Sequence, residues 1–191
     1  PLDKTKEEFD QDPVLQRFKH QLSKSGLVTK NVLKPNFEWS CEDISNIKSF
    51  YKLENYIILF PFSSAHLTIK RWPFYNELIA KINEKFKDKY QVIIAPGPNE
   101  IKIANEIDAK TILHNEKALN ISQLSTLIKD STFVIANDTG PAHMAAHLNK
   151  KGVVLFGYHT TPKKVSIETD KFKAIQADKI ETITAEHVYE K

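Results

Sequence analysis

The strongest chemical signal in the sequence is a short segment in which a carboxylate, a hydroxyl and an imidazole follow an apolar run. These side chains belong to Asp138, Thr139 and His143. Residues 132–136 are β-branched and apolar, which predicts a buried strand, and Pro141 suits the first turn of a following helix. A strand that passes through a small-residue turn into a helix directs backbone N–H groups at one point, where the helix dipole favours an anion. The segment therefore predicts an anion site, most often one for a phosphate.

Asp138 has two interpretations. A carboxylate just before a helix can cap the first turn or bond its own backbone. It can also accept hydrogen bonds from ligand hydroxyls at the mouth of a sheet, and the adjacent Thr139, Gly140 and His143 favour this interpretation. Because a carboxylate repels a phosphate, we expect Asp138 to hold a polyol. Thr139 and the N–H groups of Gly140 and its neighbours would then hold the phosphate.

His143 and His147 lie four residues apart, which is also the spacing of a zinc-binding pair on one helix face. In that pattern the residue after the first histidine is Glu, whereas here it is Met144, and no third ligand is evident nearby. We therefore expect neither a metal nor a cofactor. His143, in the first turn, can reach an anion, and His147 is expected to be a packed or edge histidine.

A second group of candidates precedes the helix that Pro73 opens. Lys70 is a cation at the end of a loop that follows a strand, where it can neutralise a diphosphate leaving group. Ser63 and Ser64, on the same loop, are either donors to phosphate oxygens or plain turn residues. Trp72 is expected to be a packing residue.

Alternating strands and helices must position these side chains. The predicted strands are 56–60, 91–95, 111–113, 132–136, 153–156 and, at an edge, 172–175. The predicted helices are 13–22, 44–53, 73–87, 100–107, 120–130, one that begins at 141, and 184–189. Near-continuous apolar strands that alternate with helices predict a parallel sheet covered on both faces, in the α/β class.

In such sheets ligands bind outside the carboxyl ends of the strands, near the point where the strand order reverses. The loops expected to form the site are 61–72, 96–100, 114–120, 137–141 and 157–162. Glu100 begins one of the predicted helices, where its charge suits the dipole; binding a ribose diol is the alternative.

Composition narrows the class of protein. The 191 residues are 41% hydrophobic and 27% charged, and the net charge of +3 does not indicate nucleic-acid binding. No apolar run is long enough to span a bilayer, and the charged N-terminus lacks a signal-peptide core. A start at Pro1 suggests a processed or truncated chain. Cys41 stands alone, so we expect no disulfide framework, a plain packing or surface thiol, and a cytoplasmic location.

Five glycines leave several common motifs absent from the sequence. There is no G-x-G-x-x-G for a dinucleotide, no G-x-x-x-x-G-K-[ST] of a P-loop and no G-x-S-x-G nucleophile elbow. What is left is an α/β fold in which helix N-termini, rather than a glycine-rich cradle, contact a phosphate.

Taken together, these residues resemble glycosyltransferase family 9, the ADP-heptose:lipopolysaccharide heptosyltransferases. The family's D-[ST]-G-x-x-H-x-A-A is matched by residues 138–146, and its K-x-W-P by residues 70–73. A G-x-x-x-E-like turn at residues 97–100 and a Thr- and Pro-containing loop at residues 157–162 follow in the family's order. The resemblance covers about residues 56–190. Three features depart from the pattern: Phe62 in place of a Gly, a loop after Ser64 about two residues longer, and an altered loop of Tyr158, His159, Thr160 and Thr161.

The resemblance implies a Rossmann-like, doubly wound parallel sheet that is one half of a two-domain GT-B glycosyltransferase. Residues 56–191 would be the donor-binding domain, and residues 1–55 a lead-in from a missing N-terminal domain. By position, Ser63, Ser64 and Lys70 would meet the donor diphosphate or the transferred sugar.

The same resemblance assigns the remaining positions. Glu100 would bind the ribose and Leu119 would line the adenine. Asp138 would hold the heptose, and the phosphates would meet Thr139, Gly140 and His143. Lys70 and Asp138 are the residues implied in catalysis.

The implied activity is an inverting, metal-independent transfer from a nucleoside-diphosphate sugar, ADP-heptose or a similar donor, to a lipopolysaccharide-core or other glycan acceptor. The general base would lie on the missing domain, in an enzyme of the cytoplasm or of the inner membrane's surface. Two alternatives stay open: a non-catalytic nucleotide-sugar binding or regulatory module, and an unrelated α/β enzyme such as a sugar-nucleotide epimerase.

Overall fold

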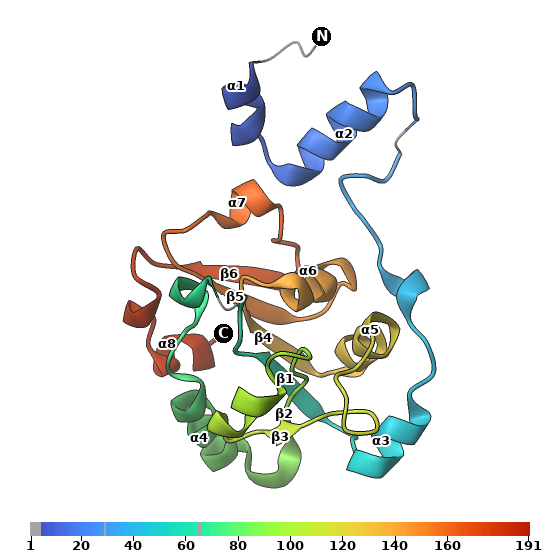
Figure 1. Cartoon of the computed structure of the whole chain (residues 1–191). Helices are drawn as coiled ribbons and strands as arrows, with labels where there is room; N and C mark the ends of the chain where they lie inside the picture. The colour runs from blue at the N-terminus through green and yellow to red at the C-terminus, as the bar shows by residue number, and fades with distance from the viewer. Residues whose placement is uncertain (1–4, 29, 65) are drawn as a thin grey trace.

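A single parallel sheet organises the chain. The computed structural model describes residues 5–28, 30–64 and 66–191. Six strands in this part pair in the order β3-β2-β1-β4-β5-β6, all parallel (Figure 1). They are β1 (Tyr56–Phe60), β2 (Gln91–Ile94), β3 (Lys110–Thr111), β4 (Phe133–Asn137), β5 (Gly152–Phe156) and β6 (Phe172–Gln176). The chain moves outward in one direction from β1 and then returns to β4 on its other side, so the predicted doubly wound fold is confirmed.

The helices and helical turns connect these strands. The α-helices are α1 (Lys6–Gln11), α2 (Val14–Lys24), α3 (Ser45–Tyr51), α4 (Tyr75–Phe86), α5 (Ile121–Asp130), α6 (Gly140–His147), α7 (Pro162–Val165) and α8 (Ala185–Tyr189). The 3₁₀ turns are η1 (Glu38–Ser40), η2 (Thr68–Lys70), η3 (Lys87–Lys89), η4 (Ile101–Glu106) and η5 (Ile180–Thr182).

Most of the predicted elements are confirmed, with boundaries that shift by one or two residues. The capping box at the start of α5 is present, since Asn120 and Gln123 exchange side-chain-to-backbone hydrogen bonds. One helix prediction is wrong in type: in place of the helix predicted at residues 100–107, residues 101–106 form the 3₁₀ turn η4. Only Ala104 of this turn is buried, and such a short segment with one buried residue gains too little from packing to hold an α-helix. Helices α1 and α7 were not predicted.

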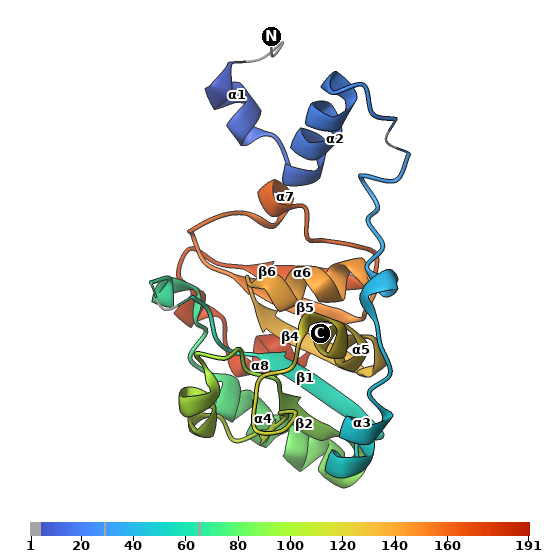
Figure 2. The same ribbon diagram turned by 45° about the vertical axis from the view of Figure 1, so that its right-hand side comes forward.

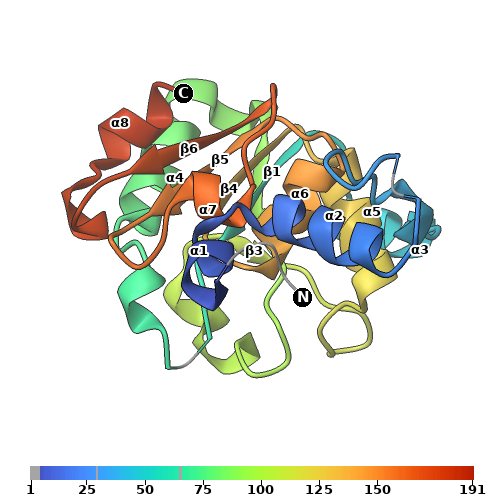
Figure 3. The same ribbon diagram turned by 90° about the horizontal axis from the view of Figure 1, so that it is seen from above.

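Two helical layers cover the sheet. Helices α5 and α6 lie on one face and α4 and α8 on the other (Figures 1 and 3). Along β1, Ile58 and Phe60 pack in the core with α3, α5 and α6, whereas Ile57 and Leu59 pack with α4 and α8. Alternate residues of a strand face opposite sides, and both sides are covered. This explains why the whole strand is apolar.

The segment before β1 has two parts. Ile44, Ile47 and Leu53 are buried in the core under α5 and α6, and Cys41 packs there partly buried. Helices α1 and α2 lie beyond α7, away from the sheet (Figure 2). In the described part of the chain, no helix has the length and apolarity to cross a membrane. The boundary at residue 55 stays a prediction.

Gly152 begins β5 where two neighbouring chain segments leave no room for a side chain. A Cβ at this position would collide with the carbonyl oxygen of Val134 and would lie 2.7 Å from Cε2 of Phe172. A carbonyl oxygen in a central strand cannot move aside without breaking the sheet. The position therefore requires glycine for space rather than for backbone freedom.

We expect Gly152→Ala to lower the free energy of unfolding by about 1–3 kcal/mol, because overpacking forces the neighbours to shift. Urea unfolding of the two proteins measures the difference. Gly157→Ala is the matched control, since a Cβ there would meet Ile180 Cβ at an ordinary 3.5 Å. Equal unfolding midpoints for the two variants would show that the close approach at Gly152 carries no cost.

Candidate functional site

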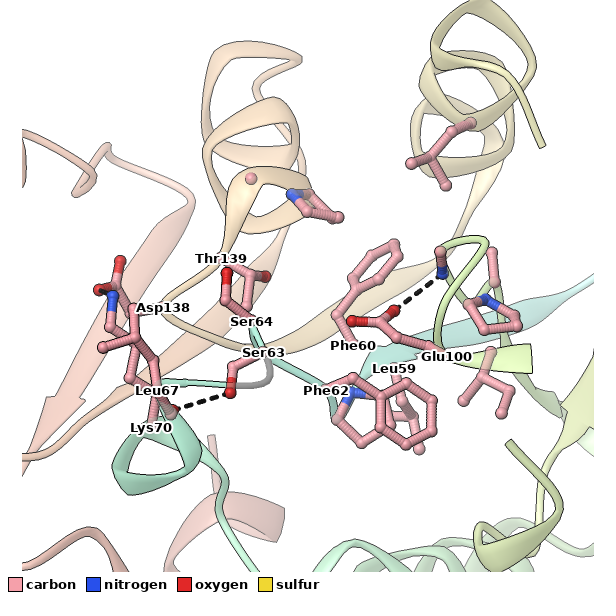
Figure 4. A pocket seen from close by; sticks show the side chains of 18 of the residues that line it. Leu59, Phe60, Phe62, Ser63, Ser64, Leu67, Lys70, Glu100, Asp138 and Thr139 are labelled. Carbon is pink, nitrogen blue, oxygen red and sulfur yellow. Dashed lines mark hydrogen bonds and ion pairs between the residues drawn. The ribbon is translucent and has the colours of Figure 1, made fainter. Parts of the chain in front are cut away.

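A cavity of about 460 Å³ opens at the carboxyl ends of β1, β2 and β4 (Figure 4). Its walls are the end of β1 with the loop that follows, the loop at residues 95–100, Leu119, Leu124 and the start of α6. The cavity lies between β1 and β4, where the winding reverses, and its volume is typical of small-molecule sites. The sheet order alone thus brings together loops that are distant in sequence.

The predicted site residues converge on this cavity. Those that line it are Ser63, Ser64, Lys70, Glu100, Leu119, Asp138, Thr139 and Gly140. His143 does not line the cavity, but its Nε2 lies 3.7 Å from Asp138 Oδ1. The ligand roles of these residues stay predictions, but their common location no longer depends on the sequence pattern.

Asp138 is the centre of the charged part of the site. Its side chain is only 5% exposed, and its Oδ2 accepts hydrogen bonds from Lys70 Nζ at 2.6 Å and from His159 Nε2 at 3.0 Å. The Oδ1 atom faces His143. One carboxylate therefore joins the turn η2, the loop after β5 and α6.

Burial alone would raise the pKa of Asp138, because a low-dielectric environment disfavours the ionised form. The contacts with His143, Lys70 and His159, together with the positive charge of Lys70, outweigh this effect. The pKa of Asp138 consequently lies well below its ordinary value, and the carboxylate is ionised at neutral pH.

The alternative interpretation of Asp138 as a helix cap is wrong. Thr139 is the residue at the N-cap of α6, and its backbone is extended there, with φ −144° and ψ 167°. No side chain caps this helix; the Thr139 hydroxyl donates instead to the carbonyl of Asn137 at 3.3 Å. At the start of α6, Pro141 has no N–H, and the N–H groups of Ala142 and His143 donate to the Thr139 carbonyl at 3.1 and 3.3 Å. Gly140 and Pro141 line the cavity, so the positive end of the helix dipole faces it.

Ser63 and Ser64 differ in their surroundings. Ser63 is buried, its hydroxyl donates to the carbonyl of Leu67 at 2.9 Å, and it accepts from Arg71 Nε at 3.3 Å. The Arg71 guanidinium also donates to the Ser63 carbonyl at 2.9 Å. These bonds support the turn interpretation for Ser63. Ser64 is exposed at the cavity wall and keeps the phosphate interpretation.

The side chain of Glu100 closes the turn at residues 97–100. One of its carboxylate oxygens accepts from the backbone N–H of Gly97 at 2.8 Å (Figure 4). A Cβ on Gly97 would approach the same oxygen to 3.2 Å, so glycine keeps the turn tight. The carboxylate is thereby held in a fixed orientation on the cavity wall, where the ribose role stays a prediction.

Asn137, His159 and Arg71 were missed at the sequence level. The buried Asn137 donates to the Pro61 carbonyl at 2.7 Å and accepts from Trp72 N–H at 3.3 Å and from the Tyr75 hydroxyl at 3.2 Å. This amide binds the loop after β1 to the end of β4. An Asn just before Asp138 at a strand's end was the available signal, and His159 lay in a loop already expected to face the site.

Trp72 is buried, and its Nε1 donates to the carbonyl of Ile183 at 2.7 Å, which confirms the packing prediction. His143 and His147 lie with their ring centroids 6.4 Å apart. Burial lowers the pKa of His147, and the nearby His143 lowers it further. Within residues 5–28, 30–64 and 66–191, no group of three or more His, Cys, Asp or Glu side chains is arranged to hold a metal ion.

The fold and the cavity together define the class: a Rossmann-like α/β domain with a ligand-sized cavity at its switch point. The profile of Glycosyltransferase family 9 (heptosyltransferase) matches residues 3–187. The chain therefore belongs to this family, and the family assignment made from the motifs is confirmed.

Solved structures show the same fold. ADP-heptose lps heptosyltransferase II of E. coli has a TM-score of 0.62 and 22% identity, over 86% of this chain and 51% of that one. Heptosyltransferase WaaC of E. coli, solved with ADP, has a TM-score of 0.66 and 17% identity, over 94% of this chain and 56% of that one. The chain thus spans about half the length of these GT-B proteins.

The fold is shared more widely. UDP-GlcNAc 2-epimerase of Methanocaldococcus jannaschii, solved with UDP-GlcNAc and UDP, has a TM-score of 0.52 and 16% identity, over 92% of this chain and 53% of that one. Among curated proteins, a search found no significant match. The fold alone consequently does not separate a transferase from an epimerase, whereas the family match does.

The lowered pKa of Asp138 has a consequence for stability. A carboxyl whose pKa is lower in the folded chain than its unfolded value of about 3.9 stabilises the fold above that pH, and the stabilisation is lost as the pH falls toward the folded value. We expect Asp138→Asn to be less stable than the natural protein at neutral pH. The difference in stability between the two proteins should shrink below about pH 5. Urea midpoints across this range measure it.

Asp178→Asn, at an exposed aspartate after β6, is the control. We expect its urea midpoint to follow that of the natural protein throughout. A gap for Asp138→Asn that stays constant from neutral to acidic pH would contradict the linkage.

Proposed function

We propose that this chain is the donor-binding part of an inverting, metal-independent glycosyltransferase that uses a nucleoside-diphosphate sugar. The observation that carries the proposal is the cavity at the switch point, where Lys70 and Asp138 meet at 2.6 Å beside the N-terminus of α6. An ammonium and a helix N-terminus favour a diphosphate, and a fixed carboxylate accepts sugar hydroxyls. Membership in glycosyltransferase family 9 supports the same reading.

The donor we propose is ADP-heptose or a close analogue. Asp138 would hold the heptose, while Lys70, Ser64, Thr139, Gly140 and His143 face the diphosphate. Glu100 would take the ribose and Leu119 would line the adenine, and both residues line the cavity. The names of the two E. coli neighbours, one an ADP-heptose enzyme and one solved with ADP, support adenine as the base.

In the proposed reaction an acceptor hydroxyl, on a lipopolysaccharide core or another glycan, attacks the anomeric carbon of the donor sugar. A base takes the hydroxyl proton, the bond from the anomeric carbon to the diphosphate oxygen breaks, and the nucleoside diphosphate leaves. Lys70 and the N-terminus of α6 stabilise the charge that develops on the leaving group. Closure against a second domain would exclude water from the donor.

Residues 56–191 would form the donor domain, and residues 1–55 would lead into it from a preceding acceptor domain. The base is proposed to lie in that preceding domain. We further propose that the enzyme works in the cytoplasm, at or near the inner membrane's surface where such acceptors are made.

We expect the chain to bind ADP more tightly than UDP or GDP in calorimetric titrations. Lys70→Ala should weaken ADP binding about tenfold or more, because a charge-assisted hydrogen bond to phosphate is lost. Asp138→Ala should weaken an ADP-sugar more than ADP itself, since its partner is the sugar.

Lys48→Ala is the matched control for Lys70. Lys48 also donates to an aspartate, Asp130 at 2.7 Å, but this pair lies outside the cavity. We expect its ADP affinity to equal that of the natural protein. Indifference of the chain to all three nucleotides would overturn the proposed function.

We also expect the chain alone to transfer almost no sugar, since the base lies elsewhere. Joining it to its preceding domain should start transfer, and EDTA should not reduce the rate because the proposed reaction needs no metal. Product formation from ADP-heptose and a lipopolysaccharide-core acceptor measures this. Transfer by the 191-residue chain itself would refute the placement of the base, and nucleotide binding without transfer by the joined protein would identify a non-catalytic module.

A further inference from the structure

His159 makes one hydrogen bond in the described part of the chain, and it goes to Asp138. The bond joins Nε2 of the imidazole to Oδ2 of the carboxylate at 3.0 Å. The side chain is 8% exposed, and Nδ1 is buried without a hydrogen-bond partner. The ring stacks on Phe156 at the end of β5, with centroids 5.9 Å apart and planes inclined by 14°. Packing therefore orients the imidazole so that its polar bond is directed at the carboxylate.

In the proposed function, the Lys70 ammonium interacts with two anionic groups, the Asp138 carboxylate and the donor diphosphate. Lys70 contacts Oδ2 at 2.6 Å, and in the proposed function the same ammonium faces the donor diphosphate. Any movement of the Lys70 ammonium toward a phosphate weakens its ion pair with Asp138. A carboxylate that is only 5% exposed and has lost its counter-charge is costly, because little water can replace the lost partner.

The other neighbours of Asp138 differ in how they can compensate. His143 stands 3.7 Å from Oδ1, beyond direct hydrogen-bond distance, and its side chain is 33% exposed. His159 is nearer, more buried, and bonded to the same oxygen as Lys70. It is the group placed to hold that oxygen when the ammonium leaves.

We propose that His159 is a positioning residue that keeps the Asp138 carboxylate ionised and fixed while Lys70 turns to the donor diphosphate. The proposal rests on the proposed function for the role of Lys70, whereas the coupling between His159, Lys70 and Asp138 exists without any ligand. In this arrangement Asp138 keeps its orientation toward the sugar in both positions of the lysine.

A purely structural histidine would behave differently, and two substitutions separate the cases. His159→Phe keeps an aromatic ring for Phe156 and removes the hydrogen bond. His159→Gln loses the ring and keeps an N–H donor that can reach Asp138. If His159 acts by packing, His159→Phe should preserve its role better than His159→Gln. If His159 acts by positioning Asp138, His159→Gln should preserve its role better.

The first experiment is a double-mutant cycle on the 191-residue chain, read as urea midpoints at neutral pH. We expect Lys70→Met combined with His159→Phe to lower the midpoint by more than the sum of the single shifts, because the carboxylate then loses both partners on Oδ2. Lys70→Met with His159→Gln should show no such excess. In an Asp138→Asn background the excess should vanish.

Additive shifts in the first combination would overturn the proposal. Failure of the Lys70→Met, His159→Phe chain to fold, while the Lys70→Met, His159→Gln chain folds, would support it. Failure of both combinations would overturn it, since a donor at position 159 would then make no difference.

The second experiment titrates ADP into the single variants. We expect His159→Phe to weaken ADP binding about tenfold and His159→Gln to stay within about threefold of the natural protein. Equal affinities for the two variants would overturn the positioning role. Absence of ADP binding by the natural protein would refute the proposed function, and the double-mutant cycle would still decide whether His159 supports Asp138.

Discussion

The site depends on the cost of burying one carboxylate. Asp138 is almost excluded from solvent, and an isolated charge in that position would destabilise the fold. Lys70 and His159 compensate it from two different loops, and His143 adds a second imidazole from α6. Lys70 lies in η2, His159 in the loop after β5 and His143 in α6, so three segments meet at this one carboxylate and compensate its charge. The geometry of the cavity wall follows from this convergence.

A second buried polar group extends the same constraint to the fold. The Asn137 side chain bonds the Pro61 carbonyl, the Trp72 amide and the Tyr75 hydroxyl, so the end of β4 holds both ends of the long loop after β1. Satisfied buried networks of this kind specify one arrangement, since any shift leaves a polar group unpaired. Lys70 lies on that loop, between Pro61 and Trp72. Asn137 therefore positions the lysine that its neighbour Asp138 needs.

Family membership and site geometry carry different parts of the functional argument. Membership in glycosyltransferase family 9 rests on a profile that matches residues 3–187, while the similarity to an epimerase shows how widely the fold is shared. The cavity adds what the fold lacks, namely a cation, a carboxylate and a helix N-terminus within one small volume. A buried ion pair is by itself weak evidence of a structural role, and the location of this pair at a ligand-sized cavity suits the binding role proposed above.

The sequence by itself determined the alternation of strands and helices and a parallel sheet covered on both faces, and it singled out Lys70 and Asp138 as candidates. Each depends on periodicity or on the chemistry of adjacent residues, which the linear pattern contains. Only the tertiary structure decided that Ser63 is held in a turn, that residues 101–106 form a 3₁₀ turn, and that His159 and Asn137 belong to the site. The positions of His159 and Asn137 depend on contacts between segments that the sheet order brings together, and pairing across such sequence distances leaves no local pattern. The Ser63 turn and the 3₁₀ turn are local, but they depend on hydrogen bonding and burial that residue types alone do not specify.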